Sequence, residues 1–293
     1  MDENYDGLIM EELHRNNKIV AFIVVLLAVC AFVCYGMYEN NALTVSRYEI
    51  DARKNDRNGD CDVAVRAVHI SDFHNARFGK DNARLIEFIK EQKPDVIFIT
   101  GDHVDSVKTN TEISLAFSQD LLEIAPVFYV TGNHEHRLGD VGARFVENLS
   151  EAGITVLMNS TAVFEKNGCA LNIVGLKDPD FYGDEPGCIL ANLETIMPVD
   201  GFNVVLSHRP ERFDEYVKAD ADLVLCGHAH GGQFRLPRIG GVFAPEQGFF
   251  PEYDAGIFQK DGTKMIVSRG LGNSIIPVRI GNRPEVVVVD FLY

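Results

Sequence analysis

Short apolar runs, separated by stretches with helical patterning, most restrict how this 293-residue chain can fold. The runs are rich in β-branched and aromatic residues and are mostly apolar on both faces, as strands buried within a parallel sheet are. They occupy residues 63–70, 95–100, 127–131, 171–176, 203–207 and 223–227. Helical patterning lies between them, over residues 82–92, 111–124, 142–152, 187–196 and 211–218. This alternation predicts an α/β protein.

The two ends of this region are expected to contribute further strands. Residues 44–50 read as a first strand, and strand-like runs recur at 266–269 and 286–291. The C-terminal third has no long helical pattern, so we expect its runs to extend a sheet.

Polar side chains follow five of the six apolar runs, at the point where each run ends. In chain order they are Asp72, His74, Asp102, Asn133, His208, His228 and His230. Ligands of open α/β sheets bind outside the carboxyl ends of the strands. We therefore expect these side chains to converge on one place.

The residue types indicate metal binding. Asp, Asn and His offer oxygen and nitrogen donors without thiolates, a set that suits Mn, Fe or Zn. The pairs Asp72/His74 and His228/His230 are spaced i, i+2, which in an extended segment directs both side chains to one side. One ion would not use all the donors, whereas two divalent ions sharing a bridging carboxylate would. Each motif alone also fits an ordinary turn, but five together favour a site.

The order of the motifs resembles the calcineurin-like metallophosphoesterase superfamily. Its signature is D-x-H, G-D-x-x-D, G-N-H-E/D, a lone H and G-H-x-H, and every block is present between residues 63 and 231. The continuation resembles the bacterial branch of membrane-associated phosphoesterases. This resemblance implies a four-layer α/β/β/α sandwich.

The resemblance also implies roles for the motif residues. The first metal would be held by Asp72, His74, Asp102 and His230, and the second by Asp102, Asn133, His208 and His228. A metal-bound hydroxide would attack the phosphorus of a phosphomono- or diester in line. His134 would protonate or stabilise the leaving oxygen.

The sequence allows two roles for several residues. His103 either faces the site or packs in the core, and His136 either contacts substrate or lies on the surface. Asp178 either approaches substrate or forms a turn. Asp105 either orients neighbouring groups or caps a turn, and Glu135 would orient neighbouring groups. Arg209, Arg235 and Arg269 either bind phosphate or have structural roles.

Residues 19–38 contain no charged side chain. Twenty such residues in a helix span about 30 Å, the thickness of a bilayer core. A signal peptide or a buried helix are the alternatives, but a signal peptide usually has a shorter apolar core. We therefore expect a tail (1–18), a transmembrane anchor (19–38), a linker with a first strand (39–60) and a catalytic domain (61–293). Arg15 and Lys18 favour a cytoplasmic N-terminus, whereas Arg47, Arg53, Lys54 and Arg57 after the segment favour the opposite orientation. Large domains translocate despite their charges, so we expect an extracytoplasmic catalytic domain at the cell membrane.

The formal net charge of -16 disfavours nucleic acid as the main partner. The expected partners are a membrane and a small-molecule or lipid-linked phosphoester, the latter from a cell envelope. A non-catalytic scaffold with the same fold is the alternative function. A scaffold should lack ligands, and here none is missing.

Overall fold

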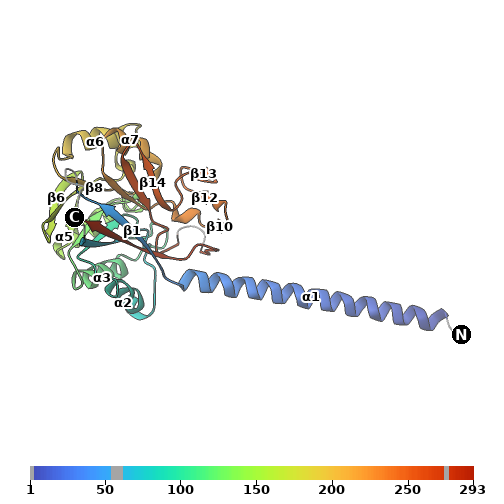
Figure 1. The fold of residues 1–293 in the computed structure, drawn as a ribbon. Helices are drawn as coiled ribbons and strands as arrows, with labels where there is room; N and C mark the ends of the chain where they lie inside the picture. Colours follow the sequence, from blue (N-terminus) through green and yellow to red (C-terminus); the bar gives the residue numbers. More distant parts are fainter. Residues whose placement is uncertain (1–2, 54–61, 274–276) are drawn as a thin grey trace.

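The computed structural model describes residues 3–53, 62–273 and 277–293. Two six-stranded sheets form its centre (Figure 1). The first sheet has the order β1 (Thr44–Asp51), β16 (Glu285–Leu292), β2 (Val63–Ile70), β3 (Val96–Thr100), β4 (Val127–Val130) and β5 (Thr155–Val156). The second has the order β14 (Gly256–Lys260), β15 (Thr263–Val267), β9 (Leu223–Cys226), β8 (Phe202–Leu206), β7 (Cys169–Gly175) and β6 (Ser160–Lys166).

Three hydrophobic cores separate four layers. The central core joins both sheets and includes Ala67 and Phe98 of the first and Ile173 and Val204 of the second. The outer face of the first sheet packs on α2 (Ala83–Lys90), α3 (Thr111–Leu122) and α5 (Asp140–Glu151). The outer face of the second packs on α6 (Cys188–Ile196) and α7 (Phe213–Lys218). This confirms the predicted α/β/β/α sandwich.

Parallel pairing aligns the strand ends that matter for function. In the first sheet β2, β3 and β4 are parallel, with Ile70 paired to Ile99 and Thr100 paired to Val130. In the second sheet β8 and β9 are parallel, with Leu206 paired to Leu225. The residues after each strand therefore leave the same edge of their sheet.

The five predicted helices are present within one or two residues of their expected bounds. The structure adds α4 (Asn133–Arg137), which begins inside the third motif, and the antiparallel pairing of β6 with β7. It also adds a small lobe, residues 234–250, built from two hairpins: β10 (Arg235–Leu236) with β11 (Gly240–Gly241), and β12 (Phe243–Ala244) with β13 (Gly248–Phe249). These short pieces carry little periodicity that a sequence pattern would reveal.

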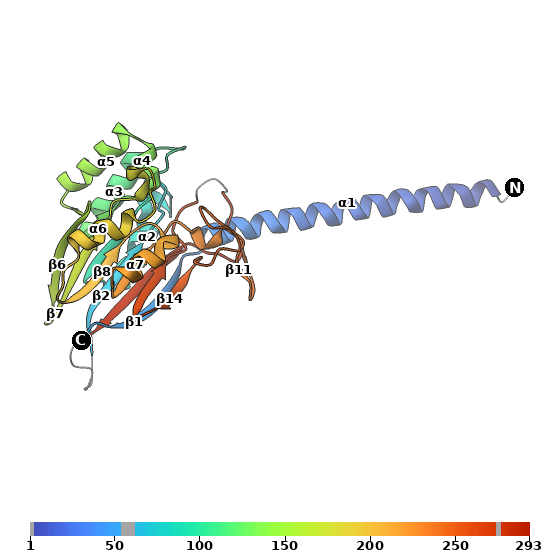
Figure 2. The same ribbon diagram turned by 90° about the horizontal axis from the view of Figure 1, so that it is seen from above.

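A single helix, α1 (Glu3–Asn41), runs from the predicted tail through the uncharged segment (Figure 2). It projects away from the domain, and its stretch Leu13–Asn41 is long and apolar enough to cross a membrane. The lobe lies at the same end of the domain in both views. Within the predicted linker, β1 is an edge strand of the first sheet, whereas residues 54–61 lie outside the described residues.

Candidate metal centre

The ends of β2, β3, β4, β8 and β9 bring the predicted donors together in two buried groups. Their backbone differs from the extended segment that the i, i+2 spacing suggested. Asp72, His74, His228 and His230 all have positive φ, between 47° and 66°. The extended interpretation is therefore wrong, because tight left-handed turns follow the strands. As a result His228 and His230 diverge and lie in different groups.

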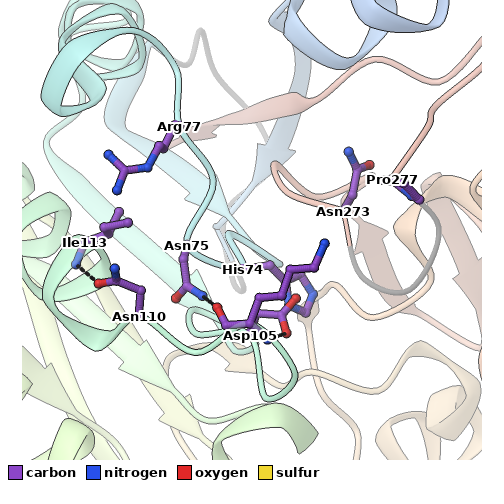
Figure 3. A pocket seen from close by; sticks show the side chains of 9 residues that line it. His74, Asn75, Arg77, Asp105, Asn110, Ile113, Asn273 and Pro277 are labelled. Atoms are coloured by element: carbon purple, nitrogen blue, oxygen red, sulfur yellow. Dashed lines mark hydrogen bonds between the residues drawn. The ribbon is translucent and has the colours of Figure 1, made fainter. Parts of the chain in front are cut away.

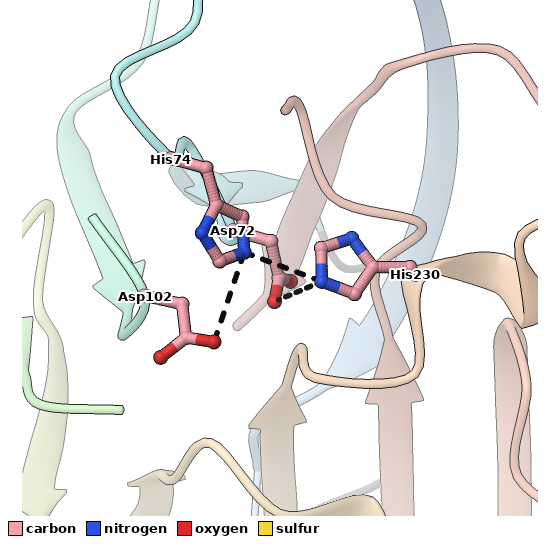
Figure 4. A group of neighbouring side chains, drawn as sticks. All are labelled: Asp72, His74, Asp102 and His230. Carbon is pink, nitrogen blue, oxygen red and sulfur yellow. Dashed lines mark hydrogen bonds and ion pairs between the residues drawn. The ribbon is translucent and has the colours of Figure 1, made fainter. Parts of the chain in front are cut away.

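The first group consists of Asp72, His74, Asp102 and His230 (Figure 4). His74 Nε2 lies 3.7 Å from Asp102 Oδ2, and His230 Nε2 lies 3.5 Å from Asp72 Oδ1. The two Nε2 atoms are 3.3 Å apart. All four side chains are buried, so two carboxylates and two ring nitrogens meet in surroundings largely shielded from solvent.

The second group consists of Asp102, His208 and His228. His208 Nε2 lies 3.1 Å from Asp102 Oδ2 and 3.1 Å from His228 Nδ1. Asp102 belongs to both groups, and its Oδ2 atom is the one that faces His74 and His208 alike. This is the position that a bridging carboxylate requires.

Asn133 lies beside the second group. One end of its side-chain amide lies 3.1 Å from His228 Nδ1 and 3.2 Å from His208 Nε2, and the other end lies 3.0 Å from Arg137 Nη1. The amide oxygen accepts from the Arg137 guanidinium when it is turned to that side. The nitrogen and oxygen donors gathered in and beside the second group are of the kind that suits Mn, Fe or Zn.

The outer nitrogens of the two histidines are held by acceptors. Nδ1 of His208 donates to the carbonyl oxygen of Thr100 at 2.8 Å. Nε2 of His228 lies 2.5 Å from Oε2 of Glu246. These contacts orient each ring so that its other nitrogen faces the group, as ligand histidines require.

The pKa values of the histidines shift in opposite directions. Burial lowers the pKa of His74 to about 3, and burial with the neighbouring His74 lowers the pKa of His230 well below its usual range. These rings are therefore neutral and able to bind metal. Burial opposes the charge on His208, but the Asp102 carboxylate outweighs it and raises the pKa of His208 to about 10. Bound metal would take the place of that proton.

Glu135 connects two of the motifs through the backbone. Its carboxylate accepts N–H groups from Asp102 at 3.0 Å, His103 at 2.7 Å and Gly132 at 2.7 Å. Burial, and then the charge of Asp102, raise the pKa of Glu135 to about 7. A side chain at Gly132 would collide with the Asp102 carboxylate, so the third motif needs glycine there. Glu135 thus lies where the orienting role expected from the sequence requires it.

His134 lies beside the first group without joining it. Its Nδ1 accepts the backbone N–H of Ser106 at 2.9 Å, so the ring proton is on Nε2. That atom faces the centre, 3.9 Å from Asp102 Oδ2. The ring also packs edge-on against His74, with centroids 4.5 Å apart.

Most of the residues that had two interpretations make structural contacts. His103 packs on Phe73 and bonds Ser118 Oγ at 2.8 Å, so it belongs to the core. His136 is exposed and packs against Phe181. Asp105 caps the turn at 107 and 108 with its Oδ1 atom.

The three arginines also make ion pairs. Arg209 is fully buried and forms a two-fold ion pair with Asp178. Arg235 pairs with Asp254 at 2.9 Å, and Arg269 with Glu285 at 3.6 Å.

Sequence reasoning missed Glu246 and Arg137, which contact His228 and Asn133. Arg137 lies four residues after Asn133, one helical turn away, and this spacing was a usable signal once α4 was foreseen. Glu246 lies in the lobe, 18 residues beyond His228, where no motif or periodicity marks it.

A cavity of about 320 Å³ opens beside His74 (Figure 3). Its lining carries two cations, Arg77 and Lys108, and one carboxylate, Asp105. Asn75 donates to the carbonyl oxygen of Lys108 at 2.8 Å and Asn110 caps α3, so one wall is held by side-chain hydrogen bonds. Asn273 and Pro277 form the opposite wall.

Comparison with known proteins identifies the family. Residues 65–232 match the family model described as calcineurin-like phosphoesterase. Phosphodiesterase YaeI of Escherichia coli strain K12 is 32% identical over 239 residues, covering 78% of this chain and 82% of YaeI. The uncharacterized metallophosphoesterase YkuE of Bacillus subtilis strain 168 is 30% identical over 235 residues, covering 77% of each chain. A transmembrane protein with metallophosphoesterase domain from Danio rerio is 29% identical over 241 residues, covering 76% of this chain and 52% of that protein. The chain therefore belongs to the calcineurin-like phosphoesterase family.

Proposed function

We propose that the chain is a membrane-anchored hydrolase of phosphoesters that depends on two divalent metal ions. The observation that carries this proposal is the pair of buried donor groups that share Asp102 Oδ2. Asp72, His74, Asp102 and His230 would hold one ion, and Asp102, Asn133, His208 and His228 the other. Ions bound there would acidify a water molecule and neutralise negative charge on the phosphoryl oxygens.

The protein's own residues supply the remaining requirements. His134 would donate a hydrogen bond from Nε2–H to the leaving oxygen and so stabilise its negative charge, because Ser106 fixes that tautomer. Glu135 and Gly132 keep the Asp102 carboxylate and the start of α4 in place. Arg77 and Lys108 in the adjacent cavity provide positive charge for the part of the substrate beyond the phosphorus.

The membrane part of the proposal rests on α1. Most of its uncharged stretch lies outside the domain, with Phe22 68% and Leu27 63% accessible, so the domain itself does not bury it. The relative from Danio rerio carries the word transmembrane in its name. A lipid-linked or cell-envelope phosphoester is the substrate class that such an anchor would bring to the centre. Arg15 and Lys18 favour a site outside the cytoplasm.

The test is turnover of p-nitrophenyl phosphate and its bis ester by the full chain, stripped with chelator and reloaded with Mn. The panel then extends to glycerophosphodiesters, cyclic nucleotides and nucleotide-sugar lipids. Asp102→Asn is expected to abolish turnover and to lower the bound metal, because both groups lose a shared ligand. A metal-loaded chain that turns over none of these esters would overturn the proposal. Fewer than two ions per chain at saturation would favour the scaffold instead.

A further inference from the structure

The lobe, residues 234–250, exposes a cluster of apolar side chains. Ile239, Phe249 and Phe250 are 63%, 74% and 62% accessible, and Leu236 and Phe243 are about half exposed. Phe243 and Phe249 pack edge-on with ring centroids 5.4 Å apart, so the two strands of one hairpin present one surface. Single exposed apolar residues are ordinary, whereas a cluster on two short hairpins marks an interaction surface.

The base of the lobe is joined to the segment that holds the end of α1. Arg235 donates its backbone N–H to Ile280 at 2.9 Å, and Gln233 donates Nε2–H to the carbonyl oxygen of Val278 at 2.8 Å. On the other side of this segment, Asn40 bonds both Pro277 and Arg279 at 2.6 Å and 2.7 Å. Glu39, almost fully buried, bonds Arg283 Nε at 2.9 Å.

These contacts fix the position of the lobe along the axis of α1. The uncharged stretch ends at Tyr38, and Arg283 lies over the Tyr38 ring at 5.2 Å. A Cβ on Gly36 would lie only 3.0 Å from Val278, so glycine allows the close approach. The domain therefore touches α1 where the apolar stretch meets polar residues, which is the level of a bilayer surface. Both views place the lobe at this end of the domain (Figures 1 and 2).

The charges of the lobe suit a lipid surface. Within residues 234–250, all of which the structure describes, the charged side chains are Arg235, Arg238 and Glu246. Arg235 pairs with Asp254, and Glu246 turns inward to His228, so the exposed charge is the cation of Arg238. An apolar surface whose exposed charge is a basic residue matches the interfacial zone of a bilayer.

We infer that the lobe is a second membrane contact, in which Phe249, Phe250 and Ile239 enter the interfacial zone of the bilayer beside α1. The inference rests on the proposed anchoring by α1 and goes beyond it. Glu246 lies in the turn between β12 and β13, and its carboxylate also contacts His228. The lobe therefore joins the lipid surface directly to the metal centre and presents that centre to substrates in the same bilayer.

The chain has no tryptophan, so single-tryptophan variants of the full chain report their own surroundings. Phe249→Trp tests the lobe in liposomes that contain brominated lipid, which quenches only tryptophans in contact with the bilayer. Phe22→Trp, on exposed α1, is the control for the anchor. Val163→Trp, 57% accessible on β6 at the far edge of the second sheet, is the control for solvent.

We expect brominated lipid to reduce the emission of Phe249→Trp and Phe22→Trp but not of Val163→Trp. Quenching of Phe22→Trp alone would overturn the lobe contact and leave the anchor standing. Quenching of neither would overturn both. Blue-shifted emission of Phe249→Trp without bromine quenching would place the lobe against protein and also overturn the inference. Hydrolysis of p-nitrophenyl phosphate in the same samples reports separately on the proposed activity.

Discussion

The carboxylate of Glu135 accepts the backbone N–H of Asp102 at 3.0 Å, and so joins the loop after β3 to the first turn of α4. The same carboxylate accepts the N–H of Gly132, directly before Asn133. One buried side chain therefore sets the distance between the shared carboxylate and the amide of the second group. The arrangement holds the donors in place before any ion arrives.

Glu135→Gln is expected to destabilise the chain and weaken metal binding. The glutamine amide turns an N–H toward backbone donors, which leaves at least one of them unpaired at a cost of about 1–3 kcal/mol. Thermal unfolding in mild detergent and Mn titration measure the two effects. Glu147→Gln, on the exposed face of α5, is the matched control. Equal stability and metal affinity of the two variants would contradict the bracing role.

The sequence predicted the seven donors because each follows a strand, and parallel strands end at one edge. It predicted the helices of the outer layers because their apolar stripes repeat with the helical period. Asp72 and His74 show where local reasoning failed, since their positive φ comes from turns that a spacing alone does not reveal. The donors still converged because the sheets, and not the local extended geometry, place them.

The parts that sequence missed depend on contacts across long separations. Glu246 reaches His228 from a loop without periodicity, and Arg209 meets Asp178 across 31 residues. A lone arginine after His208 fits phosphate binding as well as an ion pair until its partner is known. Burial decides between them, and burial is a property of the assembled sheets.

His208→Ala is expected to lower the bound metal from about two ions per chain to about one. The first group keeps all four of its donors, whereas the second loses the ring that faces Asp102 Oδ2 at 3.1 Å. Metal analysis after saturation with Mn and desalting gives the count. His14→Ala, on the exposed surface of α1, should keep both ions. Loss of both ions, or of neither, in His208→Ala would reject the division into two groups.

His134→Ala is expected to slow hydrolysis of esters with poor leaving groups by about 10²–10⁴-fold. A departing alkoxide needs the hydrogen bond from His134 Nε2–H, whereas p-nitrophenolate leaves with little help, so its ester should slow much less. Metal content should not change, because His134 lies outside both groups. Rates on alkyl and p-nitrophenyl esters are compared, with His136→Ala as the control. Equal slowing of both esters would argue against stabilisation of the leaving oxygen by His134.

Arg209→Met is expected to lower the free energy of unfolding by about 3–5 kcal/mol, because it leaves the charge of Asp178 buried and unpaired. Arg209 is fully buried, its Nε and Nη2 donate to Asp178 at 2.8 Å and 3.0 Å, and Asp178 outweighs burial in raising the pKa of Arg209. Thermal unfolding of the full chain in detergent measures the loss. Arg144→Met, which breaks an exposed ion pair with Glu147, should cost less than about 1 kcal/mol. Adding Asp178→Leu to Arg209→Met should recover part of the stability, since the unpaired carboxylate is then gone. If Arg209→Met unfolds at the same temperature as Arg144→Met, the ion pair between Arg209 and Asp178 does not stabilise the fold.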